Sequence, residues 1–288
     1  MMLGGIEAGG TKFVCAVAND DLTIVERIAF PTRSPEETFN DVFEFFDKFQ
    51  LKALGIGSFG PIDVNEQSPS YGFITDTPKP FWSHFDFVGT LKEKYDVPVF
   101  WTTDVNAAAY GEKMKGSAIN NESCLYLTVG TGVGGGVIYG ENILEGFSHP
   151  EMGHILVQPH AEDPFEGGCP FHKNCLEGLA SGSAIEKRFG RKGDTIPQDD
   201  KFWKIEAYYM AQALMTYTLT LRPEKIILGG GVMMQDHLLA SLREEFSRLL
   251  NGYVATPDLS EYIVTPALKG DAGIVGSLLL AEKALREA

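Results

Sequence analysis

A loop in the second half of the chain gathers side chains that bind metal ions. Cys169, His172 and Cys175 form the pattern C-x2-H-x2-C in "GGCPFHKNCLEG". Thiolates and imidazoles at this spacing suit zinc, which takes four such ligands in a closed structural site. A disulfide is disfavoured because the reducing cytoplasm, where we expect this chain to act, keeps thiols reduced. The alternative is a surface loop that holds no metal.

Three glycine-rich turns could bring backbone N–H groups close to a phosphate. They are "GIEAGGTK" at residues 5–12, "LTVGTGVGGG" at residues 127–136 and "IILGGGV" at residues 226–232. The Gly-Thr pair that begins at Gly10 recurs at Gly130, an offset of 120 residues, which indicates an internal duplication. Backbone N–H groups and a threonine hydroxyl at such a turn can donate hydrogen bonds to phosphate oxygens. One such turn alone could be an ordinary tight hairpin.

The second glycine turn also fits the pattern of a dinucleotide-binding motif. Gly130, Gly132 and Gly135 match G-x-G-x-x-G, which requires a strand before the turn and a helix after it. The residues that follow, "GVIYGE", are β-branched and end in another glycine, so they predict a strand. A hairpin is therefore favoured over a Rossmann turn. A nucleotide-binding assay would separate a kinase from an NAD-dependent oxidoreductase.

One carboxylate stands where a predicted strand gives way to a predicted helix. Asp104 follows "VPVFWTT" and precedes "VNAAAYGE". A carboxylate at the end of a strand can accept the proton of a hydroxyl that attacks a phosphoryl group. The residues alone favour the simpler interpretation, in which Asp104 caps the helix.

Strands that enter the glycine turns, and helices between them, must position these residues. Strands are predicted on both sides of the first two turns, before the third turn, and at "DLTIVERIAFPT", "LKALGIGSFGPID" and "VPVFWTT". Helices are predicted at "PEETFNDVFEFFDKF", "VGTLKEKY", "DVNAAAYGEKMK", "HLLASLREEFSRLL" and "AGIVGSLLLAEKALREA", and around Ser183–Phe189 and Trp203–Leu221.

The composition excludes several classes of function. The 288 residues suggest two domains, and a hydrophobic content of 44% is enough for a core. A net charge of −15 argues against non-specific nucleic-acid binding. No run approaches the roughly 18 apolar residues that span a membrane, and no signal-peptide pattern precedes the first turn. We therefore expect a cytoplasmic protein without nucleic-acid or membrane partners.

Five ordered motifs together resemble the ROK family of sugar kinases, most closely its bacterial fructokinase branch. They are "GIEAGGTK", "LTVGTGVGGG", "TTDVNAAAYGE", "HPEMGH" and "CLEGLASG", and they extend over nearly the whole chain. The resemblance implies an α/β fold of the two-domain, actin-like (ribonuclease H-like) ATPase class, with ATP in the cleft between the domains. The domains are expected at residues 1–116, with a closing helix at about 272–288, and at residues 117–271.

The resemblance also assigns roles to individual residues. ATP and its phosphates are expected at Glu7, Gly9, Gly10, Thr11, Lys12, Thr131, Gly132, Gly229, Gly230 and Gly231. The sugar is expected at Gly60, Pro61, Thr103, Asp104, Glu151, His154 and Glu177, with Phe59 and Trp82 as further walls of its pocket. Asp104 matches the general base of the family, which reverses the preference for a helix cap.

The family commonly binds one zinc ion with a histidine and three cysteines. His154 matches that histidine, Cys169 and Cys175 match two of the cysteines, and His172 stands in for the third. A metal held in this way would fix the neighbouring sugar carboxylates.

Two positions depart from the family's usual residues. Glu7 replaces the usual first aspartate, as in the fructokinase branch, and Thr103 replaces an asparagine thought to contact the sugar. The second change disfavours a simple glucokinase.

These observations predict ATP-dependent phosphorylation of fructose to fructose 6-phosphate, with Mg²⁺ required at the ATP phosphates. The resemblance suggests a homodimer. One alternative is a mannose or glucose kinase of broad specificity. Another is a non-catalytic sugar-sensing regulator, which in this family carries a helix-turn-helix ahead of the first glycine motif. Since this chain reaches that motif at residue 4, and retains Asp104, we expect an enzyme.

Overall fold

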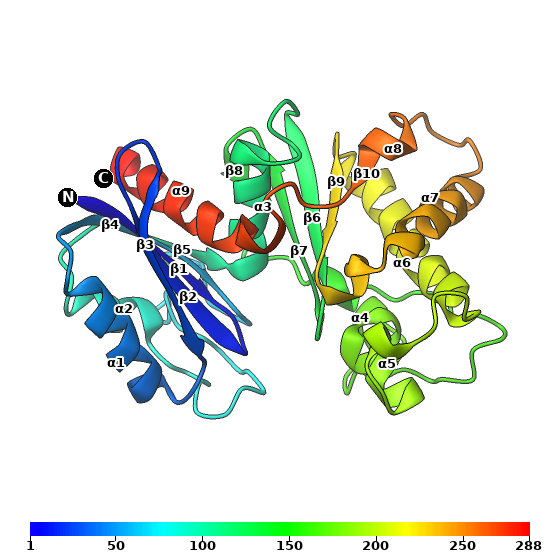
Figure 1. Cartoon of the computed structure of the whole chain (residues 1–288), viewed down its shortest axis with the longest axis horizontal. Helices are drawn as coiled ribbons and strands as arrows, with labels where there is room; N and C mark the ends of the chain where they lie inside the picture. Colours follow the sequence, from blue (N-terminus) through cyan, green and yellow to red (C-terminus); the bar gives the residue numbers. More distant parts are fainter. The chain divides into compact units, whose positions relative to one another are not determined.

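The chain folds into two units (Figure 1). The structure is a computed structural model that describes residues 1–288, with the exception of the Asp236 side chain. Unit 1 consists of Met1–Ile119, Glu141–Pro150 and Gly270–Ala288, and unit 2 consists of Asn120–Gly140 and Glu151–Lys269.

Unit 1 is built on a mixed sheet with the strand order β3-β2-β1-β4-β5. Its strands are β1 (Met2–Ala8), β2 (Lys12–Ala18), β3 (Ile24–Pro31), β4 (Leu51–Ser58) and β5 (Val99–Thr103). β1 and β2 form an antiparallel hairpin around the first glycine turn, whereas β1, β4 and β5 run parallel. The carboxyl ends of these three parallel strands therefore meet at one edge of the sheet, where α/β proteins bind ligands.

Helices cover both faces of this sheet (Figure 1). They are α1 (Pro35–Phe46), α2 (Phe87–Lys92), α3 (Asp104–Lys115) and α9 (Ala272–Glu287). α9 packs on β1 and β4 and against α3. On the other face, aromatic rings form the core, with Phe39 and Phe87 at a centroid distance of 4.9 Å and Phe13 and Trp82 at 5.6 Å. Trp82 is fully buried there. The sequence had led us to expect Trp82 as a wall of the sugar pocket. Instead its ring packs against Phe59 inside the core, at a centroid distance of 5.4 Å.

A second sheet repeats this arrangement, in the order β10-β9-β6-β7-β8. The strands are β6 (Ser123–Val129), β7 (Val133–Tyr139), β8 (Asn142–Ile143), β9 (Ile226–Gly229) and β10 (Ile263–Val264). The helices are α4 (Leu176–Ala180), α5 (Gly182–Phe189), α6 (Phe202–Leu221), α7 (Asp236–Leu250) and α8 (Leu259–Tyr262). Short 3-10 turns occur at Met152–His154, Gly193–Thr195, Gly231–Met234 and Lys269–Asp271.

The two sheets have equivalent topologies, as the repeated glycine turn indicated. β6 pairs antiparallel with β7 and parallel with β9, just as β1 pairs with β2 and β4. The second glycine turn is thus a hairpin, and the Rossmann alternative is wrong. The sequence missed β8, β10, α4 and α8, which are two to five residues long and too short to show a period.

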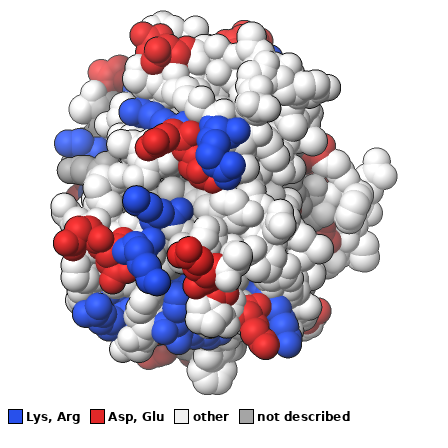
Figure 2. All heavy atoms as spheres, turned by 90° about the vertical axis from the view of Figure 1, so that its right-hand side faces the viewer, with Lys and Arg blue, Asp and Glu red and all other residues white. Residues whose placement is uncertain are grey.

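The surface carries both signs of charge. Figure 2 shows Lys and Arg interspersed with Asp and Glu on the face drawn there, and no basic stripe of the kind that tracks a nucleic-acid backbone. Among the described residues, no helix is long and apolar enough to cross a membrane.

Candidate functional site

Hydrogen bonds hold the base of the first glycine turn, and its tip is open. The Gly9 N–H donates to the Lys12 carbonyl at 2.9 Å, and Thr32 bonds both sides of the turn, to the Gly9 carbonyl at 2.7 Å and the Thr11 carbonyl at 3.0 Å. A Cβ added to Gly10 would meet no atom within 4 Å. Packing within the chain therefore does not require a glycine at this position.

Glu7 lies at the end of β1, behind this turn. Its carboxylate packs against Gly273 in the first turn of α9 and accepts a hydrogen bond from the Ile274 N–H. Burial raises the pKa of the Glu7 carboxyl, while the nearby Lys12 and Arg27 charges oppose the shift. Its Oε2 is buried without a hydrogen-bond partner. One acceptor oxygen thus remains for a cation or a donor.

The structure shows which residue caps α3. The residue that caps α3 is Thr103, whose Oγ1 accepts a hydrogen bond from the Asn106 N–H at 3.2 Å. Asp104 is the first residue of the helix, and its Oδ1 accepts from the adjacent Val105 N–H at 2.8 Å. The interpretation of Asp104 as the cap is therefore wrong, and its carboxylate is left for another purpose.

The environment of Asp104 suits a group that takes up a proton near neutral pH. Burial raises the pKa of the Asp104 carboxyl to about 7, and the Glu7 carboxylate adds to the shift, while the Val105 N–H opposes it. A general base works best when its pKa lies near the operating pH.

A turn after β4 brings Gly60 and Pro61 to the same edge of the sheet. The Phe59 N–H donates to the Ala8 carbonyl at 2.7 Å, which ties this turn to the end of β1. On its far side the Pro61 carbonyl accepts from the Thr75 N–H at 2.9 Å. Unit 1 therefore brings together Glu7, the first glycine turn, the Gly60–Pro61 turn, Thr103 and Asp104.

In unit 2 the second and third glycine turns lie side by side. Gly230 has a φ of 90°, and a Cβ on it would come within 2.4 Å of the Val129 carbonyl at the end of β6. Only glycine allows this combination of backbone angle and close approach. The amino end of α5 closes the same corner, because the Gly182 N–H donates to the Gly130 carbonyl at 2.7 Å.

The glycines at the tips of these two turns resemble Gly10. A Cβ on Gly130 or Gly231 would also meet nothing within 4 Å. Gly132 differs, because its Cβ would approach Glu177 Oε2 to 2.6 Å. Each of the three turns thus has a tip whose lack of a side chain serves no internal contact, as expected where backbone must approach a ligand.

A cavity of about 700 Å³ opens beside these turns and is lined in part by Thr131 and Gly231. Its other walls include the apolar side chains of Ile185, Trp203 and Val232. The volume and the mixture of apolar walls with a few polar groups are typical of a small-molecule site. No motif indicated this cavity, because Ile185 and Trp203 lie in segments whose apolar spacing predicts only helices.

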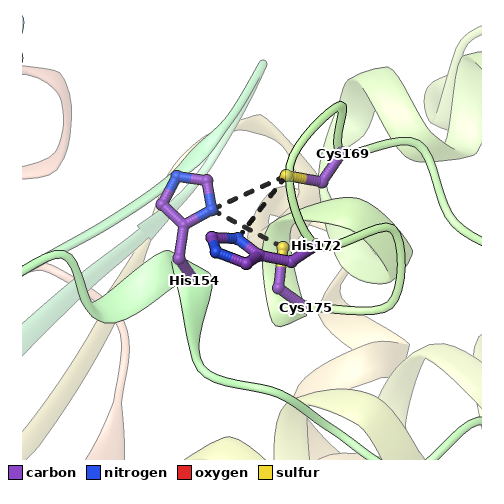
Figure 3. Close-up of side chains that lie close together, drawn as sticks. All are labelled: His154, Cys169, His172 and Cys175. Atoms are coloured by element: carbon purple, nitrogen blue, oxygen red, sulfur yellow. Dashed lines mark hydrogen bonds between the residues drawn. The ribbon is translucent and has the colours of Figure 1, made fainter.

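The predicted metal loop brings its four ligands together (Figure 3). One ligand atom from each of His154, Cys169, His172 and Cys175 lies within 4.8 Å of all the others. Cys169 Sγ lies 3.8 Å from His154 Nδ1 and 3.9 Å from His172 Nδ1, and Cys175 Sγ lies 3.6 Å from His154 Nδ1. Tetrahedral zinc separates sulfur and nitrogen ligands by about 3.6 Å, from its usual bond lengths. The cluster therefore fits a tetrahedral ion of this kind.

Local backbone structure holds these ligands. A bridge between Cys169 and Lys173 closes a tight turn, with Lys173 at a φ of 51°. Cys175 caps α4, and its Sγ accepts from the Gly178 N–H at 3.4 Å. Burial raises the pKa of the Cys175 thiol to about 11, so a bound cation is what would favour its thiolate.

Glu177 lies between the metal cluster and the second glycine turn. Its Oε1 lies 3.9 Å from His154 Nε2, on the side of the ring away from the metal ligands. Its Oε2 accepts from the Val133 N–H at 2.9 Å. Unit 2 therefore brings together Thr131, Gly132, His154 and Glu177, with Glu151 at the start of the short turn that carries His154.

Comparison with known proteins agrees with this architecture. Residues 3–284 match the ROK family. The chain belongs to the ROK family. A fructokinase from Pediococcus pentosaceus is 50% identical over 288 residues and is covered completely, as is this chain. A fructokinase from Streptococcus mutans is 48% identical, with 98% of each chain covered.

The solved structure of a ROK hexokinase from Thermus thermophilus matches this chain with a TM-score of 0.82 at 28% identity, with 100% of both chains covered. Together with the two equivalent sheets, this likeness confirms the expected α/β, actin-like (ribonuclease H-like) fold. Glu7 lies near the end of β1, Asp104 directly follows β5, and the three glycine turns follow β1, β6 and β9.

Proposed function

We propose that this ROK protein is a fructokinase that transfers the γ-phosphoryl group of ATP to a hydroxyl of fructose, giving fructose 6-phosphate and ADP. The reaction class rests on one observation above all. Asp104 directly follows a parallel strand, its carboxylate is not used as a helix cap, and burial raises the pKa of that carboxyl to about 7. The acceptor rests on the fructokinases that are 48% and 50% identical to this chain.

In the proposed mechanism, Asp104 accepts the proton of the attacking sugar hydroxyl. The hydroxyl oxygen forms a bond to the γ-phosphorus as the bond from that phosphorus to the β-phosphate oxygen breaks, and ADP leaves with the electron pair. Mg²⁺ enters with ATP and neutralises charge on its phosphates. The unpartnered Oε2 of Glu7 supports a role for that carboxylate toward the cation.

The glycine turns are proposed to hold the phosphates of ATP. Gly9, Gly10, Thr11 and Lys12 do so from unit 1. From unit 2 they are joined by Thr131, Gly132, Gly229, Gly230 and Gly231. The open tips at Gly10, Gly130 and Gly231 support this assignment. The cavity beside Trp203 is proposed to receive the base and ribose, because it continues directly from Thr131 and has apolar walls.

The sugar is proposed to bind Gly60, Pro61, Thr103 and Asp104 of unit 1 and Glu151, His154 and Glu177 of unit 2. Carboxylate oxygens are good acceptors for pairs of sugar hydroxyls. A homodimer remains a proposal from the family resemblance, to be tested by light scattering.

We propose that the His/Cys cluster holds zinc. Two thiolates balance the charge of the ion, and four protein ligands leave no open position for chemistry. The ion would thus be structural, and it would fix the loop that carries His154 and Glu177.

The deciding experiment is a panel of hexoses tested with Mg·ATP and purified protein. We expect kcat/KM for fructose to exceed that for glucose and mannose, with fructose 6-phosphate as the product. Comparable values for all three sugars would favour the broad-specificity kinase. Sugar binding without ADP release would favour the regulator.

A further inference from the structure

His149 has no part in the proposed reaction, yet it contacts the Gly60–Pro61 turn, which we propose binds the sugar. It lies in the segment Glu141–Pro150, which belongs to unit 1. Its Nε2 accepts a hydrogen bond from the Ile62 N–H at 3.2 Å. The ring also covers Gly60, since its Cε1 and Nε2 lie 3.9 Å from the position that a Cβ on Gly60 would occupy. The imidazole therefore packs on the Gly60–Pro61 turn and accepts a hydrogen bond from the residue that follows the turn, Ile62.

This contact matters because the acceptors for the N–H groups of Phe59 and Ile62 are the Ala8 carbonyl and His149 Nε2. The Phe59 N–H is bound by the Ala8 carbonyl at 2.7 Å, and proline at position 61 has no N–H to donate. Ile62 is 2% exposed, so water cannot readily replace an acceptor for its N–H. A buried donor without an acceptor is costly, and the turn would shift to satisfy it. Ala8 thus holds the Phe59 end of the turn. At the other end, His149 binds the Ile62 N–H and Thr75 donates to the Pro61 carbonyl.

We propose that His149 is a positioning residue for the sugar. It holds the Gly60–Pro61 turn, whose residues are proposed to contact the sugar, through the hydrogen bond from the Ile62 N–H to its Nε2. This inference rests on the proposed function, because it assumes that this turn contacts the acceptor sugar.

The chemistry of the contact defines the variants that test it. Since Nε2 accepts, the imidazole is in the tautomer with its proton on Nδ1. In His149→Gln the side-chain carbonyl can reach the place of Nε2 and keep an acceptor. In His149→Phe the ring volume remains and the acceptor is lost. His160→Ala is the matched control, because His160 Nδ1 also accepts a backbone N–H, from Glu162 at 3.2 Å, in a loop without an assigned role.

The experiment measures KM for fructose, KM for ATP, kcat and Tm for each full-length variant. We expect H149F and H149A to raise KM for fructose about tenfold, as the loss of one hydrogen bond can. KM for ATP should stay within twofold, H149Q should lie near wild type, and H160A should leave KM for fructose unchanged.

Several outcomes would overturn the inference. They are an unchanged KM for fructose in H149F with only a lower Tm, equal effects of H149F and H149Q, and failure of both H149A and H149F to fold while H149Q is normal. The last would make the role structural. A wild-type protein that phosphorylates no hexose would instead refute the proposed function, so the two failures are distinguishable.

Discussion

The carboxylate of Glu177 accepts a hydrogen bond from the Val133 N–H at 2.9 Å, and so joins the metal loop to the second glycine hairpin. Its other oxygen lies 3.9 Å from His154 Nε2, the ring nitrogen opposite the one in the ligand cluster. A ligating histidine is commonly oriented by such a carboxylate. One side chain thus connects the metal cluster to a turn that we propose binds phosphate.

We therefore expect loss of the metal to weaken sugar binding strongly and ATP binding more mildly. In Cys175→Ala, or after chelation, His154 and Glu177 lose their support, and the Val133 contact loosens with them. The expected loss is at least tenfold in fructose affinity and several-fold in Mg·ATP affinity. Each displaced side chain loses about one hydrogen bond to its ligand or more. Calorimetric titration of both ligands, with the metal content measured by mass spectrometry, gives the answer.

The matched control is Cys124→Ala, which removes a buried thiol of β6 outside the cluster. It should keep its full metal content and fructose affinity. If metal-free protein that is folded by circular dichroism binds fructose normally, the link between metal and sugar is wrong.

Replacing Asp104 with asparagine should abolish most of the activity without harming the fold. Removal of a general base typically lowers kcat by about 10²–10⁴-fold. Folding should survive, because the cap of α3 is Thr103. The measurement is kcat under saturating fructose and Mg·ATP, together with Tm.

Thr103→Ala is the contrasting variant, because it removes the residue that caps α3. Loss of such a cap costs about 0.5–2 kcal/mol of stability. Thr103→Ser should restore it. Near-normal kcat in the Asp104 variant would remove Asp104 from the mechanism.

The activity should depend on pH through the ionisation of Asp104. Burial, aided by the Glu7 charge, raises the pKa of this carboxyl to about 7, and only the carboxylate form can accept a proton. We expect kcat/KM for fructose to fall about tenfold per unit below pH 7 and to level off above it. A rate profile from pH 5 to 9 tests this.

Asp104→Asn serves as the control for this profile, because ionisation of ATP also affects the rate. The residual activity of that variant should lack the part of the acid limb that belongs to Asp104. Identical acid limbs in both proteins would assign the limb to the nucleotide.

The glycines of the turns should divide into two classes. Gly10→Val should raise KM for ATP with little change in Tm, because a side chain there meets no protein atom within 4 Å. Gly230→Ala should lower Tm, because φ is 90° and the Cβ would come within 2.4 Å of the Val129 carbonyl. Steady-state kinetics and thermal unfolding separate the classes. A Gly10 variant that loses only stability would show that the first turn is purely structural.

Local features of the sequence determined much of this protein. The apolar runs around the first two glycine turns predicted hairpins, and both hairpins formed because β-branched residues follow these turns. The spacing of His172 between two cysteines predicted that these side chains lie close together, since residues three apart in one turn are close whatever the rest of the chain does.

Other features were decided only by the tertiary structure, because they depend on residues far apart in the chain. The local sequence favoured Asp104 as the cap of α3, whereas in the folded chain the cap is Thr103. Trp82 was buried by aromatic partners up to 69 residues away, such as Phe13. The contact of His149 with Ile62 spans 87 residues and leaves no periodic or motif signal in the sequence. Neighbouring residues set the local preference for a helix, strand or turn. The raised pKa of Asp104 and the cavity beside Trp203 depend on burial, which only the packed fold creates.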